Sequence, residues 1–351
     1  MEREEWPPTV RKPDIHRGRV RRSGVSLMEV LVTLTIVGLL MALLFPAIQA
    51  AREASRRTQC TDNLHQLAVA AHGFHSAHGS FPPARPCNPA VNPGWGHLVQ
   101  LLPLLDQSVP FNHIDFTKPV SDPANIGFAV TPMPVFRCPS DVDRMANPSD
   151  PLALVGYVKN NYRGNGGNDT GVLGADGVEA NNGVFVAGRK ISIDQIFDGA
   201  SNTALYSEGV LGDGNNNVSS IPGDWFAISP ASSSRDALFA AAQNTTRGTG
   251  AGVQYSYAGN TFVSGDYTTS RYNHILPPNG ISVVVVAGNS DLATSINSGA
   301  QATTASSRHP DGVNLVLVDG SVRFIKNEID TGIWRGLGSI AGGETLPDNF
   351  R

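Results

Sequence analysis

The feature that most constrains this chain is an apolar run near its N-terminus, at residues 25–45. Its 21 residues are enough to cross a hydrocarbon core of about 30 Å as a helix that rises about 1.5 Å per residue. Glu29 is the one ionisable residue within the run. We therefore expect a single membrane-spanning helix, with the bulk of the chain on one side of the membrane.

The residues in front of the apolar run predict a processing site. Residues 17–24 read Arg-Gly-Arg-Val-Arg-Arg-Ser-Gly, a basic segment that ends at Gly24. In an ordinary signal peptide the cleavage site follows a shorter apolar region. Here the candidate site precedes the apolar run, so cleavage after Gly24 would leave the helix on a mature chain that begins at Val25.

Glu29 is costly within an apolar helix, because an unpaired carboxylate there costs about 2–4 kcal/mol. After cleavage, the new ammonium at Val25 of a staggered neighbouring subunit could pair with this carboxylate and favour one packing register. The alternative is an interfacial glutamate that merely tolerates the headgroup region.

Charge predicts the orientation. Residues 1–24 carry seven basic and four acidic residues, a net charge of +3, and the remainder of the chain carries −7. The opposite orientation is favoured by the basic residues on the other flank of the apolar run, Arg52, Arg56 and Arg57. The leader has the denser basic cluster, so we place the N-terminus in the cytoplasm and everything after Pro46 outside. An acidic exported body gives no indication of a nucleic-acid partner.

The helix is expected to continue beyond the membrane. Pro46 should kink it rather than end it, because residues 47–71 contain no Gly or Pro and are rich in helix formers. The helix should end before Gly79 and the Pro82-Pro83 pair, at about His78. Its outer half should bury one face, formed by Ile48, Ala51, Leu64, Leu67, Ala71 and Phe74.

These residues together resemble the N-terminal signal of type IV prepilins and of type II secretion pseudopilins. The matching positions are Gly24, the segment Val25–Glu29 and Pro46. The resemblance implies cleavage after Gly24 and methylation of Val25 by a prepilin peptidase, and assembly through Glu29 with like or related pseudopilin subunits in the inner membrane. Valine is a departure, since these families more often begin with Phe or Met, and the leader is long.

The chain from residue 80 onward predicts a β-rich body. Short β-branched runs alternate with Gly, Asn, Asp and Pro turns, and helix is expected only at residues 95–105 and 234–243. Asp319-Gly320 between two such runs predicts a hairpin over residues 313–325. We therefore predict an α+β fold, in which a long pilin-like helix packs on a large antiparallel β-rich exported domain. Strands are expected at residues 183–187, 203–207, 282–287, 313–318 and 321–325.

A second resemblance is narrower. Residues 306–324 contain His309, then nine residues, then Asp319-Gly320, and segments such as Val135–Asp141 and Asp198–Thr203 agree with it. This pattern is similar to that of a bacterial prepilin-like family with an exported domain of unknown function (domain-of-unknown-function family 1559). The resemblance implies a single-pass, pseudopilin-like protein without an established biochemical activity.

The histidine signature has two interpretations. His309 and Asp319 could serve local hydrogen bonding, with Asp319 accepting backbone N–H groups of the hairpin turn. Alternatively, His309, Asp311 and Asp319 could form one site. No metal site is predicted, although His65, His72, His75 and His78 lie close together on the helix. Calcium is an open alternative, to be held by some of the acids Asp141, Asp143, Asp198, Asp213 and Asp319.

Cys60, Cys87 and Cys138 allow one disulfide and one spare thiol in an exported body, and spacing does not tell which pair would form. No enzyme is predicted, because the chain lacks G-x-S-x-G, H-E-x-x-H and phosphate-loop patterns.

The predicted organisation is a cleaved cytoplasmic leader (1–24), a transmembrane and extended helix (25–79) and an exported domain (80–351). The predicted function is a pseudopilin-like structural subunit of a secretion-system pseudopilus or surface fibre. The alternative is a membrane-tethered binding module for glycan, secreted protein or calcium, exposed to the periplasm or at the cell surface. A membrane-bound hydrolase ranks last.

Overall fold

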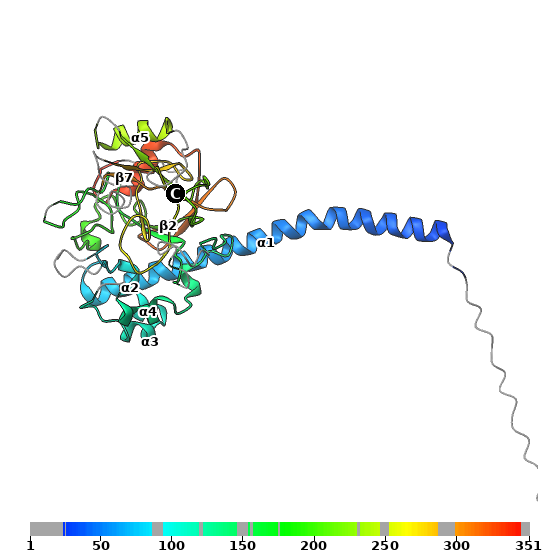
Figure 1. Ribbon diagram of the computed structural model, residues 1–351, viewed down its shortest axis with the longest axis horizontal. Helices are drawn as coiled ribbons and strands as arrows, with labels where there is room; N and C mark the ends of the chain where they lie inside the picture. The colour runs from blue at the N-terminus through cyan, green and yellow to red at the C-terminus, as the bar shows by residue number, and fades with distance from the viewer. Residues whose placement is uncertain are drawn as a thin grey trace, which may run out of the picture. The chain divides into compact units, whose positions relative to one another are not determined.

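The computed structural model describes residues 24, 26–85, 94–118, 122–145, 154, 157–174, 176–229, 232–245, 253–286 and 299–344. The chain forms two compact units, Met1–Ala51 and Arg52–Arg351. The boundary between them falls within helix α1 (Leu27–His78), whose bounds match the long helix that the sequence predicts. The outer half of that helix therefore belongs to the same compact unit as the β-rich body (Figure 1).

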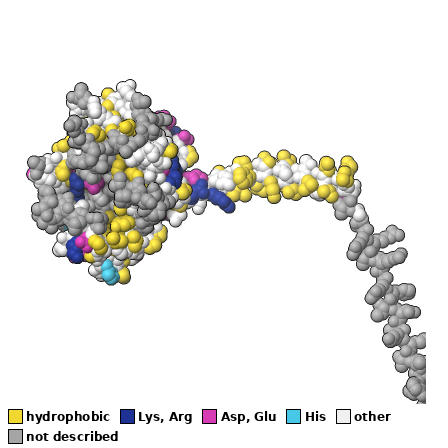
Figure 2. All heavy atoms as spheres, viewed as in Figure 1, with side chains coloured by type: hydrophobic (Ala, Val, Ile, Leu, Met, Phe, Trp, Pro, Cys, Tyr) yellow, Lys and Arg dark blue, Asp and Glu magenta, His cyan; other side chains and the backbone are white. Residues whose placement is uncertain are grey.

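In the first unit, α1 exposes its apolar side chains. Figure 2 shows hydrophobic side chains covering this part of the helix. Leu27, Leu34 and Phe45 are each more than 60% exposed. The helix is long and apolar enough to cross a membrane, as a membrane anchor or a signal sequence would be. Pro46 lies inside the helix, which continues past it.

In the second unit, α1 forms part of the main core. Its buried apolar residues recur at helical spacing and pack with side chains from the body, among them Leu98, Phe136 and Tyr206. The predicted face is confirmed at Leu64, Leu67 and Ala71, whereas Ile48 and Ala51 are exposed and lie in the first unit. The buried apolar residues of α1 are Cys60, Leu64, Leu67, Ala68, Ala70 and Ala71.

A five-stranded sheet has the order β5-β1-β2-β8-β9. All pairings in it are antiparallel except β1 with β5, which is parallel. Leu205 and Tyr206 of the central strand β2 belong to the same hydrophobic core as the buried residues of α1. The strands are β1 (Tyr162–Asn165), β2 (Ala204–Glu208), β5 (Arg271–Tyr272), β8 (Gly312–Leu317) and β9 (Val322–Lys326).

A second sheet of four short strands has the order β4-β3-β6-β7 and likewise contains one parallel pair, β3 with β6. The α+β class is therefore confirmed, and both sheets are mixed rather than wholly antiparallel. Parallel neighbours need long crossover connections, and short β-branched runs do not reveal them. The strands are β3 (Trp225–Ile228), β4 (Gln254–Tyr255), β6 (Ser282–Val285) and β7 (Gln301–Ala302).

The predicted hairpin is confirmed as β8 and β9, joined at Asp319-Gly320, where Gly320 has a φ of +85°. The strands expected at 203–207 and 282–287 appear as β2 and β6. The strand expected at 183–187 is absent: this segment forms bends and turns, although the Phe185 N–H donates to the Asn165 carbonyl. Gly183 packs directly on the backbone at Gly166 and Gly167, which favours a close loop contact over a ladder.

Short helices cover the rest of the body. The helix expected at 95–105 is divided into α2 and η1, because Pro103 interrupts it, and α5 appears as expected, capped by the Ser234 side chain. α5 packs on β6 and β7, and a further helix, α7, was not anticipated. The helices are α2 (His97–Gln100), η1 (Leu102–Leu105), α3 (Ser108–Asn112), α4 (Pro123–Ala129), η2 (Pro134–Phe136), η4 (Ile193–Gln195), α5 (Arg235–Gln243) and α7 (Thr331–Gly338).

The polar segment 165–182, whose composition is typical of a surface loop, is in part internal. Asn165, Asn168 and Asn181 are buried and bridge backbone groups of separate segments; the Asn165 amide, for example, donates to the Ala204 and Gly338 carbonyls. Buried amides are stable where both ends find partners, so polarity alone did not identify a surface segment here.

Candidate functional site

The outer half of α1 is covalently joined to the body. Cys60 and Cys138 form a disulfide, with their Cα atoms 5.3 Å apart and 78 positions apart in sequence. Cys138 lies just after η2, and both cysteines are buried. This settles the pairing that the spacing left open, and Cys87 lies outside the described residues.

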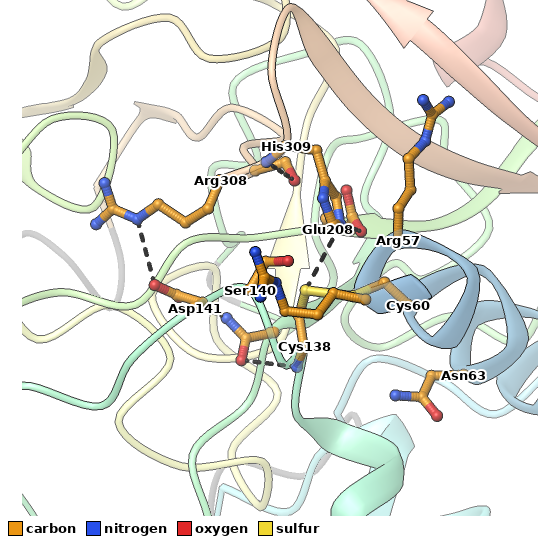
Figure 3. The surroundings of a disulfide bond; sticks show 12 residues. Arg57, Cys60, Asn63, Cys138, Ser140, Asp141, Glu208, Arg308 and His309 are labelled. Carbon is orange, nitrogen blue, oxygen red and sulfur yellow. Dashed lines mark hydrogen bonds and ion pairs between the residues drawn. A yellow bond between two sulfur atoms is a disulfide. The ribbon is translucent and has the colours of Figure 1, made fainter. Parts of the chain in front are cut away.

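His309 lies beside this disulfide, just before β8 (Figure 3). Its side chain is fully buried. Its Nδ1 lies 2.6 Å from Oε1 of Glu53, which is two helical turns before Cys60 on α1. Its Nε2 lies 3.3 Å from Oε1 of Glu208 and 3.7 Å from Sγ of Cys138. One imidazole therefore connects α1, the last residue of β2 and the disulfide.

The two carboxylates are held by further bonds. Glu208 accepts hydrogen bonds from the backbone N–H of Asn314, at 2.8 Å, and from its side-chain amide, at 2.9 Å. Glu53 accepts from Arg56 on the next turn of α1 and from the Ser140 hydroxyl. The acids cannot rotate away from His309 without breaking these bonds.

Electrostatics favour a charged histidine. Burial by itself lowers the pKa of His309, but hydrogen bonds and charge from Glu208 and Glu53 outweigh it and raise that pKa above its ordinary value. Burial likewise raises the pKa of Glu53, and the hydrogen bonds from His309, Arg56 and Ser140 lower it overall. The two neighbouring acids thus favour the protonated form of His309.

Asp141 organises the neighbouring loop. Its carboxylate accepts from the Asn161 amide at 2.7 Å, from the Leu211 N–H at 2.8 Å and from Arg308 at 3.3 Å. Arg308 immediately precedes His309, so this loop helps to fix the position of the imidazole.

The other signature residues lie apart from His309. Asp319 accepts from the Ser321 N–H and hydroxyl, at 2.8 and 2.6 Å, which is the turn chemistry that the sequence favoured. His309 and Asp319 flank opposite ends of β8, which at about 3.3 Å per residue is about 20 Å long. Asp311 is exposed, with a φ of +66°. A single site of His309, Asp311 and Asp319 is therefore wrong.

The helix histidines do not converge on one point. His65 lies 3.2 Å from the Gly320 carbonyl and His72 contacts the Val318 carbonyl, so both hold the β8–β9 turn. His75 accepts from the Ile193 N–H, and His78 contacts the Phe74 carbonyl of its own helix.

Most of the acids considered for calcium serve local structure instead. Asp198 accepts the backbone N–H groups of Gly342 and Gly343, Asp143 accepts that of Met145, and Asp213 bonds the Ser220 hydroxyl. Among the described residues, the group of His, Cys and carboxylate ligands close enough for a metal is Cys60, Cys138, Glu208 and His309.

Gly24 is exposed before α1, and Glu29 is exposed in the first turn of that helix. Val25 lies outside the described residues. The roles of Gly24 and Val25 in processing, and those of Glu29 and Pro46 in assembly, stay predictions.

Sequence reasoning missed Glu53 and Glu208 as partners of His309. Glu208, the last residue of β2, directly follows the strand predicted at 203–207, and its contact with His309 joins positions 101 residues apart. Nothing in the sequence distinguishes Glu53 from any other acidic residue on a helix, and its nearest charged neighbours along the helix are arginines.

Comparison with known proteins adds one finding. Residues 49–332 match the family described as "Protein of unknown function (DUF1559)". No curated protein and no solved structure matches the chain. The match includes Glu53, both bridged cysteines, Glu208 and His309, and it begins beyond the apolar half of α1. The chain therefore belongs to the DUF1559 family of proteins of unknown function.

Proposed function

We propose that this chain is a pseudopilin-like structural subunit, cleaved after Gly24 by a prepilin peptidase and assembled through its N-terminal helix. The observation that carries the proposal is the continuity of α1. One helix exposes an apolar half and, without a break, contributes its other half to the core of the body. A subunit of this kind would pack with its copies through the exposed apolar half of α1.

Glu29 supports this proposal. It is exposed in the first turn of α1, among side chains that are themselves exposed and apolar. An acid at such a position favours a partner of opposite charge. The ammonium of a processed Val25 on a neighbouring subunit would supply that charge.

The test begins with intact mass and N-terminal sequencing of the chain recovered from membranes that contain a prepilin peptidase. We expect a mature chain that starts at methylated Val25. Glu29→Ala should be processed normally but should lose helix-to-helix crosslinks and fibres. Thr33→Ala is the matched control, because the Thr33 hydroxyl bonds only the Val30 carbonyl of its own helix. A chain that keeps residues 17–24, or fibres of Glu29→Ala at the parental level, would refute the proposal.

The second candidate is a membrane-tethered binding module. It is favoured by a surface hollow of about 370 Å³ beside α3 and α4, lined largely by apolar side chains. Such hollows are the usual places for ligands. A tethered monomer would give no crosslinks between α1 helices even when processed, so the same crosslinking experiment distinguishes the two candidates. The proposal includes no catalytic role. The residues that line the hollow are Val109, Pro110, His113, Ala124, Gly127, Phe128 and Thr131.

A further inference from the structure

The side chains around the disulfide form a set of four ligands. Sγ of Cys60, Sγ of Cys138, a carboxylate oxygen of Glu208 and a ring nitrogen of His309 all lie within 4.8 Å of one another. They come from α1, the segment after η2, the end of β2 and the loop before β8 (Figure 3). All four residues are buried.

Two of the distances between the ligand atoms, both from His309, already suit a tetrahedral zinc ion. With Zn–N and Zn–O near 2.1 Å and Zn–S near 2.3 Å, neighbouring ligand atoms should lie about 3.4 Å apart for N and O, and about 3.6 Å for N and S. The observed distances from His309 Nε2 are 3.3 Å to Glu208 and 3.7 Å to Cys138. Breaking the S–S bond would let the two sulfurs separate and complete the tetrahedron.

The surroundings also fit a zinc site. Histidines that bind zinc commonly donate their other ring N–H to a carboxylate, which fixes the ring and its tautomer. Glu53 stands in that position at Nδ1 of His309, at 2.6 Å. Asn314 holds Glu208 through two hydrogen bonds, so this carboxylate is oriented as well. The ring is thus positioned with Nε2 facing the sulfurs and Glu208.

We propose that Cys60, Cys138, Glu208 and His309 bind one Zn²⁺ when the Cys60–Cys138 disulfide is reduced. A dithiol reduces the bridge by supplying two electrons and two protons, forming its own disulfide and two cysteine thiols. Zinc then binds the two thiolates, the carboxylate and Nε2, and the two thiol protons pass to solvent, together with the proton that Nε2 carries in the charged form of His309. Two thiolates, a histidine and a carboxylate are all ligand types that zinc binds, and their tetrahedral arrangement suits this ion.

The proposed site is structural rather than catalytic, because four protein ligands fill a tetrahedral ion and the side chains are buried. Zinc would join the same segments that the disulfide joins, so the two states are alternative ways to fasten α1 to the body. This site could not be recognised from the sequence, because the two cysteines are 78 positions apart and form no metal-type pair.

The experiment uses the full chain in detergent, with Cys87→Ser so that two cysteines remain. The protein is purified throughout in a trialkylphosphine, which ends as the phosphine oxide as it reduces the bridge with water. Alkylation and mass measurement verify two free thiols. Co²⁺ is then added as the probe, followed by Zn²⁺.

We expect one Co²⁺ per chain, with thiolate-to-cobalt absorption in the near ultraviolet, bleached by one equivalent of Zn²⁺. Zinc should also protect both thiols from alkylation. The oxidised chain should show neither effect. Glu208→Gln keeps both thiols and should weaken zinc binding more than tenfold, whereas Glu328→Gln, at an exposed position outside the cluster, should bind as the parent does.

Several results would overturn the proposal. One is a reduced chain that gives no thiolate-to-cobalt absorption. Another is equal zinc affinity in the parent, Glu208→Gln and His309→Gln, since metal would then be held by free thiols outside this geometry. Circular dichroism of each reduced chain separates loss of the site from loss of the fold. Cobalt bound without thiolate absorption would lie outside this ligand set and would also count against the site.

Discussion

His309→Gln tests whether a charged imidazole fastens α1 to the body. Glutamine keeps much of the volume and a hydrogen-bond donor but cannot carry charge between Glu53 and Glu208. Removing one partner of a buried ion pair costs about 3–5 kcal/mol. Here the Glu53 side chain is 28% exposed and Glu208 keeps both bonds from Asn314, so we expect a loss of about 2–4 kcal/mol in unfolding free energy.

The loss should depend on pH in a defined direction. The pKa of His309 is raised above its ordinary 6.5, so its contribution to stability is fully present below about pH 6.5 and disappears as pH rises through the folded value. The pKa of Glu53 is lowered below its ordinary 4.5, so its contribution is present above about pH 4.5 and disappears as pH falls through the folded value. The variant should therefore differ most from the parent between those two values.

The assay is urea unfolding of the oxidised chain in detergent, followed by the fluorescence of the buried Trp95, Trp225 and Trp334. His113→Gln is the matched control, because His113 is exposed and, among the described residues, its ring hydrogen-bonds only the Val109 carbonyl. It should change stability by less than about 0.5 kcal/mol. A loss for His309→Gln that stays constant from pH 5 to 9, or one as small as that of the control, would refute the electrostatic argument.

Three further predictions concern the same unit. Cys60→Ser opens a loop of 78 positions and should cost about 4 kcal/mol, measured by urea unfolding against the reduced parent, which should lose a similar amount. Asp319→Ala and Gly320→Ala should each cost about 1–2 kcal/mol, because one loses the turn bonds to Ser321 and the other strains a φ of +85°, while neither changes the environment of His309 as seen by NMR titration. A fragment that begins at residue 49 should fold and remain soluble, whereas one that begins at residue 80 should aggregate, as gel filtration would show.

Helix α1 could be predicted because its signals are local. The apolar run at residues 25–45 and the helix-forming residues 47–71, which contain no Gly or Pro, predict α1 without any tertiary information. The β8–β9 hairpin was equally accessible, since the Asp319-Gly320 turn and the alternating strands around it lie within about fifteen residues. Such features depend on backbone preference and periodicity, which the sequence displays directly.

The candidate site was harder to predict, because it is formed by residues that are far apart in the sequence. His309 stood out by its family resemblance, yet its partners come from α1 and from the end of β2. Asp319 belongs to the same sequence signature as His309 but lies at the far end of β8. Its hydrogen bonds within the turn explain its presence there. The imidazole lies between two acids only because three segments that are distant in sequence come together in the fold. No local residue pattern predicts that arrangement.

The outer half of α1 is an integral part of the body, and this explains why the family match begins at residue 49. The match starts just before Glu53 and takes in the helical residues that the body buries, whereas the apolar half of α1 lies outside it. Two buried leucines contribute about 2–3 kcal/mol each, which with the disulfide approaches the whole stability of a typical domain. A body deprived of residues 49–79 would therefore expose its core. The disulfide, the contacts of His309 and the core packing all act on this one helical segment, which is therefore part of the folded body.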